Sequence, residues 1–155
     1  MPAQKLKQML DERNIKYISI NHSPAYTARE TAASTFVPRR EFAKTIIVDL
    51  DGDKVMAVVS ASRHVDIAGL RKLAAAKEAR LATEDEFRAL FPDCELGAMP
   101  PFGSLYGMRV FVDEMVTEVD DLCFNAGSHE QILRMNCADF LQIEQPVTGS
   151  IAVKE

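Results

Sequence analysis

Lys44 is the residue whose type and position most directly suggest chemistry. It stands immediately before the apolar segment TIIVDL (residues 45–50), whose composition predicts a buried strand. A lysine at the end of a buried strand can place its ammonium in a cleft, where it holds a phosphate or stabilises a developing negative charge. A solvated surface lysine would account for the same position, so Lys44 alone does not decide between the two.

The segment ELGAMPPFG (residues 95–103) is the second candidate. It places two glycines and two adjacent prolines around small and apolar residues. Proline fixes φ and removes a backbone donor, whereas glycine frees the backbone. We therefore expect an ordered loop here rather than a helix or a strand.

Metal-dependent and nucleophilic chemistry are not indicated. The histidines His22, His64 and His129 are far apart in the sequence and no HExxH motif is present, so we expect no metal site. The glycine motifs that bind phosphates or dinucleotides and the serine nucleophile motif are also missing, and we expect no cofactor. Neither Cys94 nor Cys123 has a nearby histidine or a recognised flank, which weighs against a cysteine nucleophile.

The composition predicts one globular domain spanning residues 1–155. Apolar residues make up 47% of the chain and charged residues 26%, which excludes a disordered class. No apolar run is long enough to cross a bilayer, and the first residues lack the apolar region of a signal peptide. The three cysteines, with no CxxC spacing, fit a reducing compartment. We expect a cytoplasmic protein without membrane contact.

Charge is divided unevenly along the chain. The net charge of −5 argues against broad affinity for nucleic acid, yet residues 1–80 carry +5 and residues 81–155 carry −10. The basic half can face a polyanion, although a solvated acidic surface explains the same asymmetry. The candidate phosphate contacts are Arg39, Arg40, Lys44, Arg63 and Lys72.

Alternating helix and strand patterns predict a mixed α/β domain with a largely antiparallel sheet. Two capping boxes, Thr27-x-x-Glu30 and Thr83-x-x-Glu86, mark helix starts, and Asp66 and Asn136 are further N-cap candidates. The residues DGD (51–53) predict a hairpin turn between two buried strands. The expected helices cover residues 2–14, 28–36, 67–76, 84–91 and 137–143, and the expected strands cover residues 16–20, 44–50, 54–60, 109–114, 121–126 and 130–135.

These elements, in this order, carry residues that resemble one family. The chain resembles the YbaK/ProX family of aminoacyl-tRNA deacylases, the editing domain that is also inserted in bacterial prolyl-tRNA synthetases. The resemblance covers roughly residues 5 to 145. It is carried by His22, Ala25, Thr27 and Glu30, by Ala43-Lys44-Thr45, by Cys94-Glu95-x-Gly97-x-x-x-Pro101-Phe102-Gly103, by Val112-Asp113 and by Asn125-Ala126-Gly127.

The resemblance implies a fold, an activity and a site. The implied fold is a mixed, curved, partly barrel-like β-sheet with flanking helices, of the α+β type. The implied activity is hydrolysis of the ester that joins a wrong amino acid to the 3′-terminal adenosine of a tRNA, with Lys44 and Gly97 in catalytic positions. Lys44 would anchor a phosphate or the carbonyl-side charge, and the loop at Gly97 would present backbone N–H groups to the oxyanion. The implied substrate-binding residues are Thr45, Ala98, Met99, Pro100, Pro101, Phe102, Gly103, His129, His22, Arg39 and Arg40.

Several alternatives stay open at this stage. A member that has lost hydrolysis could serve as a module that binds tRNA or a synthetase, and the net acidic charge would suit a hydrolase of a small aminoacyl or nucleotide ester. A prolyl-tRNA synthetase is a further candidate partner. Thr45 stands where some alanine-editing members carry asparagine, so a preference for alanine does not carry over. The sequence does not indicate the oligomeric state.

Overall fold

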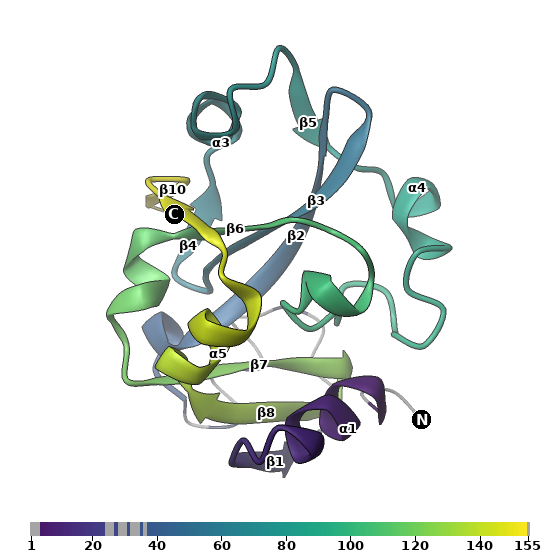
Figure 1. Cartoon of the computed structure of the whole chain (residues 1–155), viewed down its shortest axis with the longest axis vertical. Coiled ribbons are helices and arrows are strands. Elements are labelled where there is room, and N and C mark those ends of the chain that lie inside the picture. The colour runs from purple at the N-terminus through teal and green to yellow at the C-terminus, as the bar shows by residue number, and fades with distance from the viewer. Residues whose placement is uncertain (1–3, 24–26, 28–30, 32–34, 36, 155) are drawn as a thin grey trace.

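A computed structural model of the chain describes residues 4–23, 27, 31, 35 and 37–154 (Figure 1). Its strands are β1 (Tyr17–Asn21), β2 (Phe42–Leu50), β3 (Asp53–Ser60), β4 (Arg63–Val65), β5 (Ala79–Leu81), β6 (Val110–Asp113), β7 (Asp121–Ser128), β8 (Gln131–Asn136), β9 (Val147–Gly149) and β10 (Ala152–Lys154). Its α-helices are α1 (Gln4–Glu12), α3 (Ile67–Ala74), α4 (Glu84–Arg88) and α5 (Cys137–Glu144), and its short 3-10 helices are η1 (Arg39–Glu41), η2 (Gly103–Leu105) and η3 (Glu114–Glu118).

Seven strands form the large sheet in the order β1-β8-β7-β2-β3-β6-β9, and β5 adds to β2 as an eighth. Among the described residues the sheet is mixed, as the resemblance implies. Its hairpins are antiparallel, but β2 pairs with β7, β3 with β6 and β6 with β9 in parallel. The expectation of a largely antiparallel sheet therefore misses these three parallel contacts, which join strands far apart in the sequence. A separate two-stranded sheet pairs β4 with β10.

The helix starts follow the local signals in the sequence. The Asp66 side chain accepts a hydrogen bond from Gly69 N–H at the start of α3, and Asn136 accepts from Asp139 N–H at the start of α5. Both hydrogen bonds of the capping box form: the Thr83 side chain accepts from Glu86 N–H, and the Glu86 side chain accepts from Thr83 N–H. The second predicted helix would begin at Ala28, after the capping box of Thr27 and Glu30. Most of this segment lies outside the described residues, and only Thr27, Thr31 and Thr35 of it are described.

Several predicted boundaries are wrong in physically simple ways. Helix α4 ends at Arg88 rather than at residue 91, because Pro92 disfavours helical backbone just before it and Phe91 turns into the core. Strand β2 begins at Phe42, so Lys44 is its third residue and does not precede it. Strands β4, β5, β9 and β10 were not predicted, since each has three residues, mostly exposed, and therefore no apolar periodicity.

A network of ion pairs fastens β5 and α4 to the hairpin of β2 and β3. Arg80 holds the Glu86 carboxylate with two bonds of 2.7 Å, and Lys54 donates to Asp49 at 2.7 Å. The Arg80 guanidinium, followed by the Thr83 N–H, holds the pKa of Glu86 well below its usual range. The network fixes α4, and with it the point from which the chain enters the loop at residues 95–103.

The main core lies between one face of the sheet and the helices α1 and α5. At its centre the ring of Phe102 contacts those of Phe124 and Phe140, each with ring centroids 5.4 Å apart. A second core lies under α3 around Leu70 and Phe111. None of the helices in the described residues is long and apolar enough to cross a membrane.

Candidate functional site

The candidate site lies where two parallel strands of the sheet separate. Strands β2 and β7 pair only through Phe42 and Ala43, opposite Cys123 and Phe124, and then diverge (Figure 1). Farther along the same edge of β2, the carbonyl of Ile47 accepts a hydrogen bond from the N–H of Ala82. Strand β5 then pairs with the last residues of β2. We call the place between residues 44–46 of β2 and residues 125–127 of β7 the fork.

The loop predicted at residues 95–103 attaches to the β7 side of the fork through its main chain. Glu95 N–H donates to the carbonyl of Gly127 at 2.7 Å, and Gly127 N–H donates to the carbonyl of Ala98 at 2.9 Å. Within the loop, Ala98 N–H donates to the carbonyl of Glu95 at 3.0 Å and closes a tight turn. The loop is therefore ordered, as the sequence predicts, and it lies against the strand that borders Lys44.

Gly97 occupies the tip of this turn with φ of +85°. That backbone region is favourable for glycine and costly for residues with a side chain, which explains the residue type. Gly97 is exposed, and no hydrogen bond between described residues uses its N–H. Gly97 therefore combines an exposed position with an N–H that has no partner among the described residues.

His129 holds the turn from the opposite side. Its Nε2 lies 2.7 Å from the carbonyl oxygen of Leu96 and donates to it, since a carbonyl only accepts. Its backbone N–H donates to the Glu95 carboxylate at 3.1 Å. The Leu96 carbonyl and the Gly97 N–H belong to one planar trans peptide, so His129 sets the direction of that N–H. His129 was predicted near the site, and it is within contact distance of Gly97: a Cβ added there would lie 3.6 Å from its Cε1.

Lys44 and Asn125 extend from the two arms of the fork to the same face of the sheet. Each lies two residues beyond the register pair of Phe42 and Cys123, whose side chains pack in one cluster. Because side chains alternate along a strand, the side chains of Lys44 and Asn125 share the face of that pair. The structure therefore places the predicted lysine beside the loop-bearing strand.

Two buried oxygens at the fork accept no hydrogen bond from the residues that the structure describes. They are Oγ1 of Thr45 and Oδ1 of Asn125. Buried polar groups are usually satisfied, so each of these atoms needs an explanation. Thr45 was predicted to bind substrate, whereas Asn125 was not. The available signal was an asparagine inside the apolar segment DLCFNA (residues 121–126).

The remaining loop residues belong mostly to the core. Met99 is 5% exposed and Phe102 is fully buried, and both pack in the main cluster. A Cβ at Gly103 would clash with Met108 and Val110, so this glycine permits close packing. Pro100 and Pro101 are also buried. Met99 and Phe102, which the resemblance places among the substrate-binding residues, therefore have their side chains in the core behind the loop.

Met99→Ala tests this placement. We expect the free energy of unfolding to fall by about 2–5 kcal/mol, because a buried methionine leaves a cavity when it is truncated. The ranking of amino acids removed by the variant should match that of the wild type. A substrate panel and a denaturant titration measure both quantities. A shift toward bulkier amino acids at unchanged stability would instead show that Met99 lines the substrate pocket.

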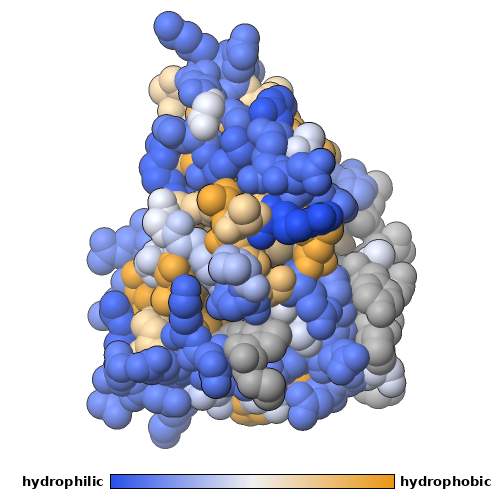
Figure 2. Space-filling view, turned by 90° about the vertical axis from the view of Figure 1, so that its right-hand side faces the viewer, coloured by the Kyte–Doolittle hydropathy of each residue, from blue (hydrophilic) through white to orange (hydrophobic). Residues whose placement is uncertain are grey.

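Figure 2 views the molecule from the side on which α4 lies in Figure 1. The surface is mostly hydrophilic, with apolar residues gathered near the middle of this face. A small hollow of about 250 Å³ lies between α4 and the start of the loop, bordered by Phe87, Phe91, Leu96 and Met99 among others. Met99 thus borders a hollow only at its edge, with most of its side chain in the core.

The other predicted binding residues lie on segments next to β2 or next to the turn between β7 and β8. Arg39 and Arg40 are exposed in η1, directly before β2, and Ser60 Oγ donates to the Arg39 carbonyl at 3.0 Å. His22 N–H donates to the Glu130 carbonyl at 2.8 Å, which places it beside the hairpin turn of His129. Lys72 is the exception. It lies on α3, which packs near β5 at the opposite end of β2.

Cysteine chemistry is unfavourable. Burial raises the pKa of Cys94 to about 11 and that of Cys123 also to about 11, so both thiols are protonated at neutral pH. The described residues contain no cluster of histidine, cysteine, aspartate or glutamate side chains arranged to hold a metal ion.

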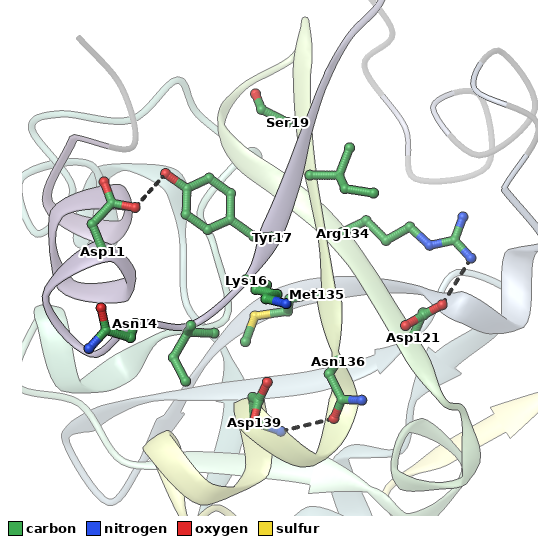
Figure 3. Close-up of a pocket in the computed structure, with 12 residues that line it drawn as sticks. Asp11, Asn14, Lys16, Tyr17, Ser19, Asp121, Arg134, Met135, Asn136 and Asp139 are labelled. Atoms are coloured by element: carbon green, nitrogen blue, oxygen red, sulfur yellow. Dashed lines mark hydrogen bonds and ion pairs between the residues drawn. The ribbon is translucent and has the colours of Figure 1, made fainter.

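A broad hollow of about 1140 Å³ lies elsewhere, between α1, β1, β8 and the start of α5 (Figure 3). None of the predicted site residues lines it. Two pairs of its polar residues interact: Tyr17 donates to Asp11 at 3.1 Å, and Arg134 donates to Asp121 at 3.1 Å. The hollow is therefore a feature separate from the fork.

Comparisons with known proteins identify the family of the chain. The model of the aminoacyl-tRNA editing domain family matches residues 22–143, which include the whole fork. A multifunctional Ser/Thr-tRNA deacylase of Escherichia coli (strain K12), ProXp-y, is 24% identical over 148 residues, which cover 92% of this chain and 88% of the relative.

Solved structures share the fold. The crystal structure of the hypothetical protein APE2540 matches with a TM-score of 0.87 at 20% identity and covers 97% of this chain and 100% of its own. A protein proposed to be a trans-editing enzyme for prolyl tRNA synthetase matches with a TM-score of 0.81 at 20% identity. The match covers 99% of this chain and 96% of that protein.

Proposed function

Because the chain belongs to the family of aminoacyl-tRNA editing domains, and is thus a hydrolase of the aminoacyl-tRNA ester, we propose that it acts in trans on mischarged tRNA. The substrate would be a tRNA of the proline type that carries a small amino acid. A synthetase pocket for a small apolar side chain rejects similar or smaller amino acids weakly, because one methylene is worth only about 1–3 kcal/mol. A separate hydrolase that removes the wrong amino acid supplies the missing discrimination.

The Gly97 N–H, which no hydrogen bond between described residues uses, is the observation that carries this proposal, together with Lys44 on the strand β2 that borders the fork. In ester hydrolysis, water adds to the carbonyl carbon, negative charge collects on the carbonyl oxygen, and the bond to the ribose oxygen then breaks. A backbone N–H fixed in direction before the reaction stabilises that charge effectively. Gly97 would supply the N–H, His129 would hold its peptide in place, and the Lys44 ammonium would add positive charge at the same end of the fork.

A panel of mischarged tRNAs tests the proposal. We would incubate the purified protein with proline-type tRNA carrying Ala, Cys, Ser, Thr or 2-aminobutyrate, and with correctly charged prolyl-tRNA as the control. We expect hydrolysis of at least one mischarged species and protection of the correct one. Tight binding of tRNA without hydrolysis would identify a binding module instead. Hydrolysis of small aminoacyl esters with no gain from the tRNA would identify a small-ester hydrolase.

The RNA would bind to the basic half of the chain (residues 1–80), at Arg39 and Arg40. Reversing both charges (Arg39→Glu with Arg40→Glu) should raise KM for aminoacyl-tRNA and flatten its dependence on salt, because fewer counterions are released on binding. Steady-state kinetics at several salt concentrations measure both effects.

The matched control for this experiment is the pair Arg71→Glu and Lys72→Glu. It makes the same change in charge on α3, away from η1. We expect it to leave the salt slope close to that of the wild type. An equal effect of the two pairs would mean that net charge, and not a surface at η1, governs binding.

A further inference from the structure

The side chain of Asn125 is buried without a hydrogen-bond partner among the described residues. It is 8% exposed in β7, and its Oδ1 is buried and accepts no hydrogen bond from the described residues. None of the hydrogen bonds between described residues involves its side-chain amide. An asparagine retained for the fold would be expected to bond to the backbone or to a neighbour. Its position at the fork therefore suggests a group that only the substrate completes.

The surroundings of Asn125 limit which substrate group this can be. A buried carbonyl oxygen needs a donor, and two donors lie close to the ester of an aminoacyl-tRNA: the α-ammonium of the amino acid and the free hydroxyl of the terminal ribose. Lys44 extends from the neighbouring strand to the same face as Asn125. Lys44 already brings one ammonium to this face, and a neutral hydroxyl adds no second cation beside it.

We propose that Oδ1 of Asn125 accepts a hydrogen bond from the ribose 2′-hydroxyl of the 3′-terminal adenosine and so positions the neighbouring ester in the fork. This inference rests on the proposed function and adds a binding residue to the same site. The hydroxyl is on the ribose carbon next to the one that carries the esterified oxygen, so holding it would orient the ester carbonyl relative to Gly97. The residue would also distinguish an RNA terminus from a DNA terminus, since only the former carries the donor.

A pair of non-hydrolysable compounds tests the contact without turnover. The first is 3′-deoxy-3′-(L-serylamino)adenosine, in which an amide replaces the ester, and the second is the same compound without the 2′-hydroxyl. Calorimetry should show the wild type binding the first about five- to tenfold more tightly than the second. The difference should disappear in Asn125→Leu, which lacks the acceptor, and persist in Asn125→Asp, which retains one. An equal preference in the wild type and Asn125→Leu would overturn the proposal, as would a wild type that binds both compounds equally or neither of them.

Thermal stability gives an independent readout. Replacing an unsatisfied buried amide by an apolar side chain of similar size removes a desolvation cost, so Asn125→Leu should have a Tm at or above that of the wild type. Asp113 is the matched control, because its two carboxylate oxygens accept from Ile151 N–H and Met115 N–H and it is 2% exposed. Asp113→Leu should lower Tm and leave the preference for the hydroxyl intact. A marked fall in Tm for Asn125→Leu would assign Asn125 to the fold. A wild type that prefers the hydroxyl but hydrolyses no aminoacyl-tRNA would contradict the proposed function alone.

Discussion

Lys44→Ala should lower deacylation by at least about tenfold, which corresponds to roughly 1.4 kcal/mol of transition-state stabilisation, and leave the fold intact. Lys44 is half-buried in β2, beside the point where the strand parts from β7. In the proposed function, an ammonium held there would be close to the charge that develops on the ester. Its removal should therefore reduce kcat more than it changes KM.

Two further variants make this result interpretable. Lys44→Met keeps the apolar part of the side chain and should lose as much activity as Lys44→Ala, which separates charge from packing. Lys77→Ala removes an exposed lysine of the same basic half and should retain full activity. Circular dichroism and thermal melts would establish that each variant is folded. Near-normal turnover by a folded Lys44→Ala protein would exclude the lysine from the mechanism.

Gly97→Val should abolish hydrolysis of every aminoacyl-tRNA at a cost in stability of about 1–2 kcal/mol. Space is not the obstacle, because the nearest atom to an added Cβ would be His129 Cε1 at 3.6 Å. The obstacle is the backbone, since φ of +85° is unfavourable for a β-branched residue. The peptide would rotate to relieve this strain and turn the Gly97 N–H away from the substrate.

Gly97→Ala provides a graded comparison. The backbone at residue 97 is also unfavourable for alanine, but its side chain is smaller than that of valine. Gly97→Ala should therefore retain more activity than Gly97→Val and still be less stable than the wild type. Single-turnover kinetics on one mischarged tRNA would rank the three proteins. If Gly97→Val hydrolysed its substrates at the wild-type rate, the N–H of this residue would have no part in catalysis and the loop would serve only as scaffold.

The sequence predicts well those features that depend on neighbours along the chain. The N-caps at Asp66, Thr83 and Asn136 form as expected, because a capping side chain reaches only the next turn of its own helix. The hairpin of β2 and β3 follows from its turn residues in the same way. The proline-rich loop is ordered because its backbone restrictions are local.

The fork could not be predicted from such signals. It arises from a parallel contact of only two residue pairs between β2 and β7, which are separated by most of the other elements. The bonds that tie the loop to Gly127 are between main-chain groups, and these leave no trace in residue types. Asn125 carries part of the resemblance but was not assigned a binding role, for a related reason: a polar residue in an apolar strand does not reveal whether its side chain finds a partner.

The attachment of the loop through main-chain bonds has a consequence for how such a site can change over generations. Every residue except proline offers the same N–H and every residue offers the same carbonyl, so the bonds of Glu95 and Ala98 to Gly127 tolerate many substitutions. Side chains at the fork other than that of His129 can thus be exchanged one at a time while the peptide of Gly97 keeps its place. An ancestral enzyme with this arrangement could acquire new amino-acid preferences through single mutations without first losing its ability to hydrolyse esters.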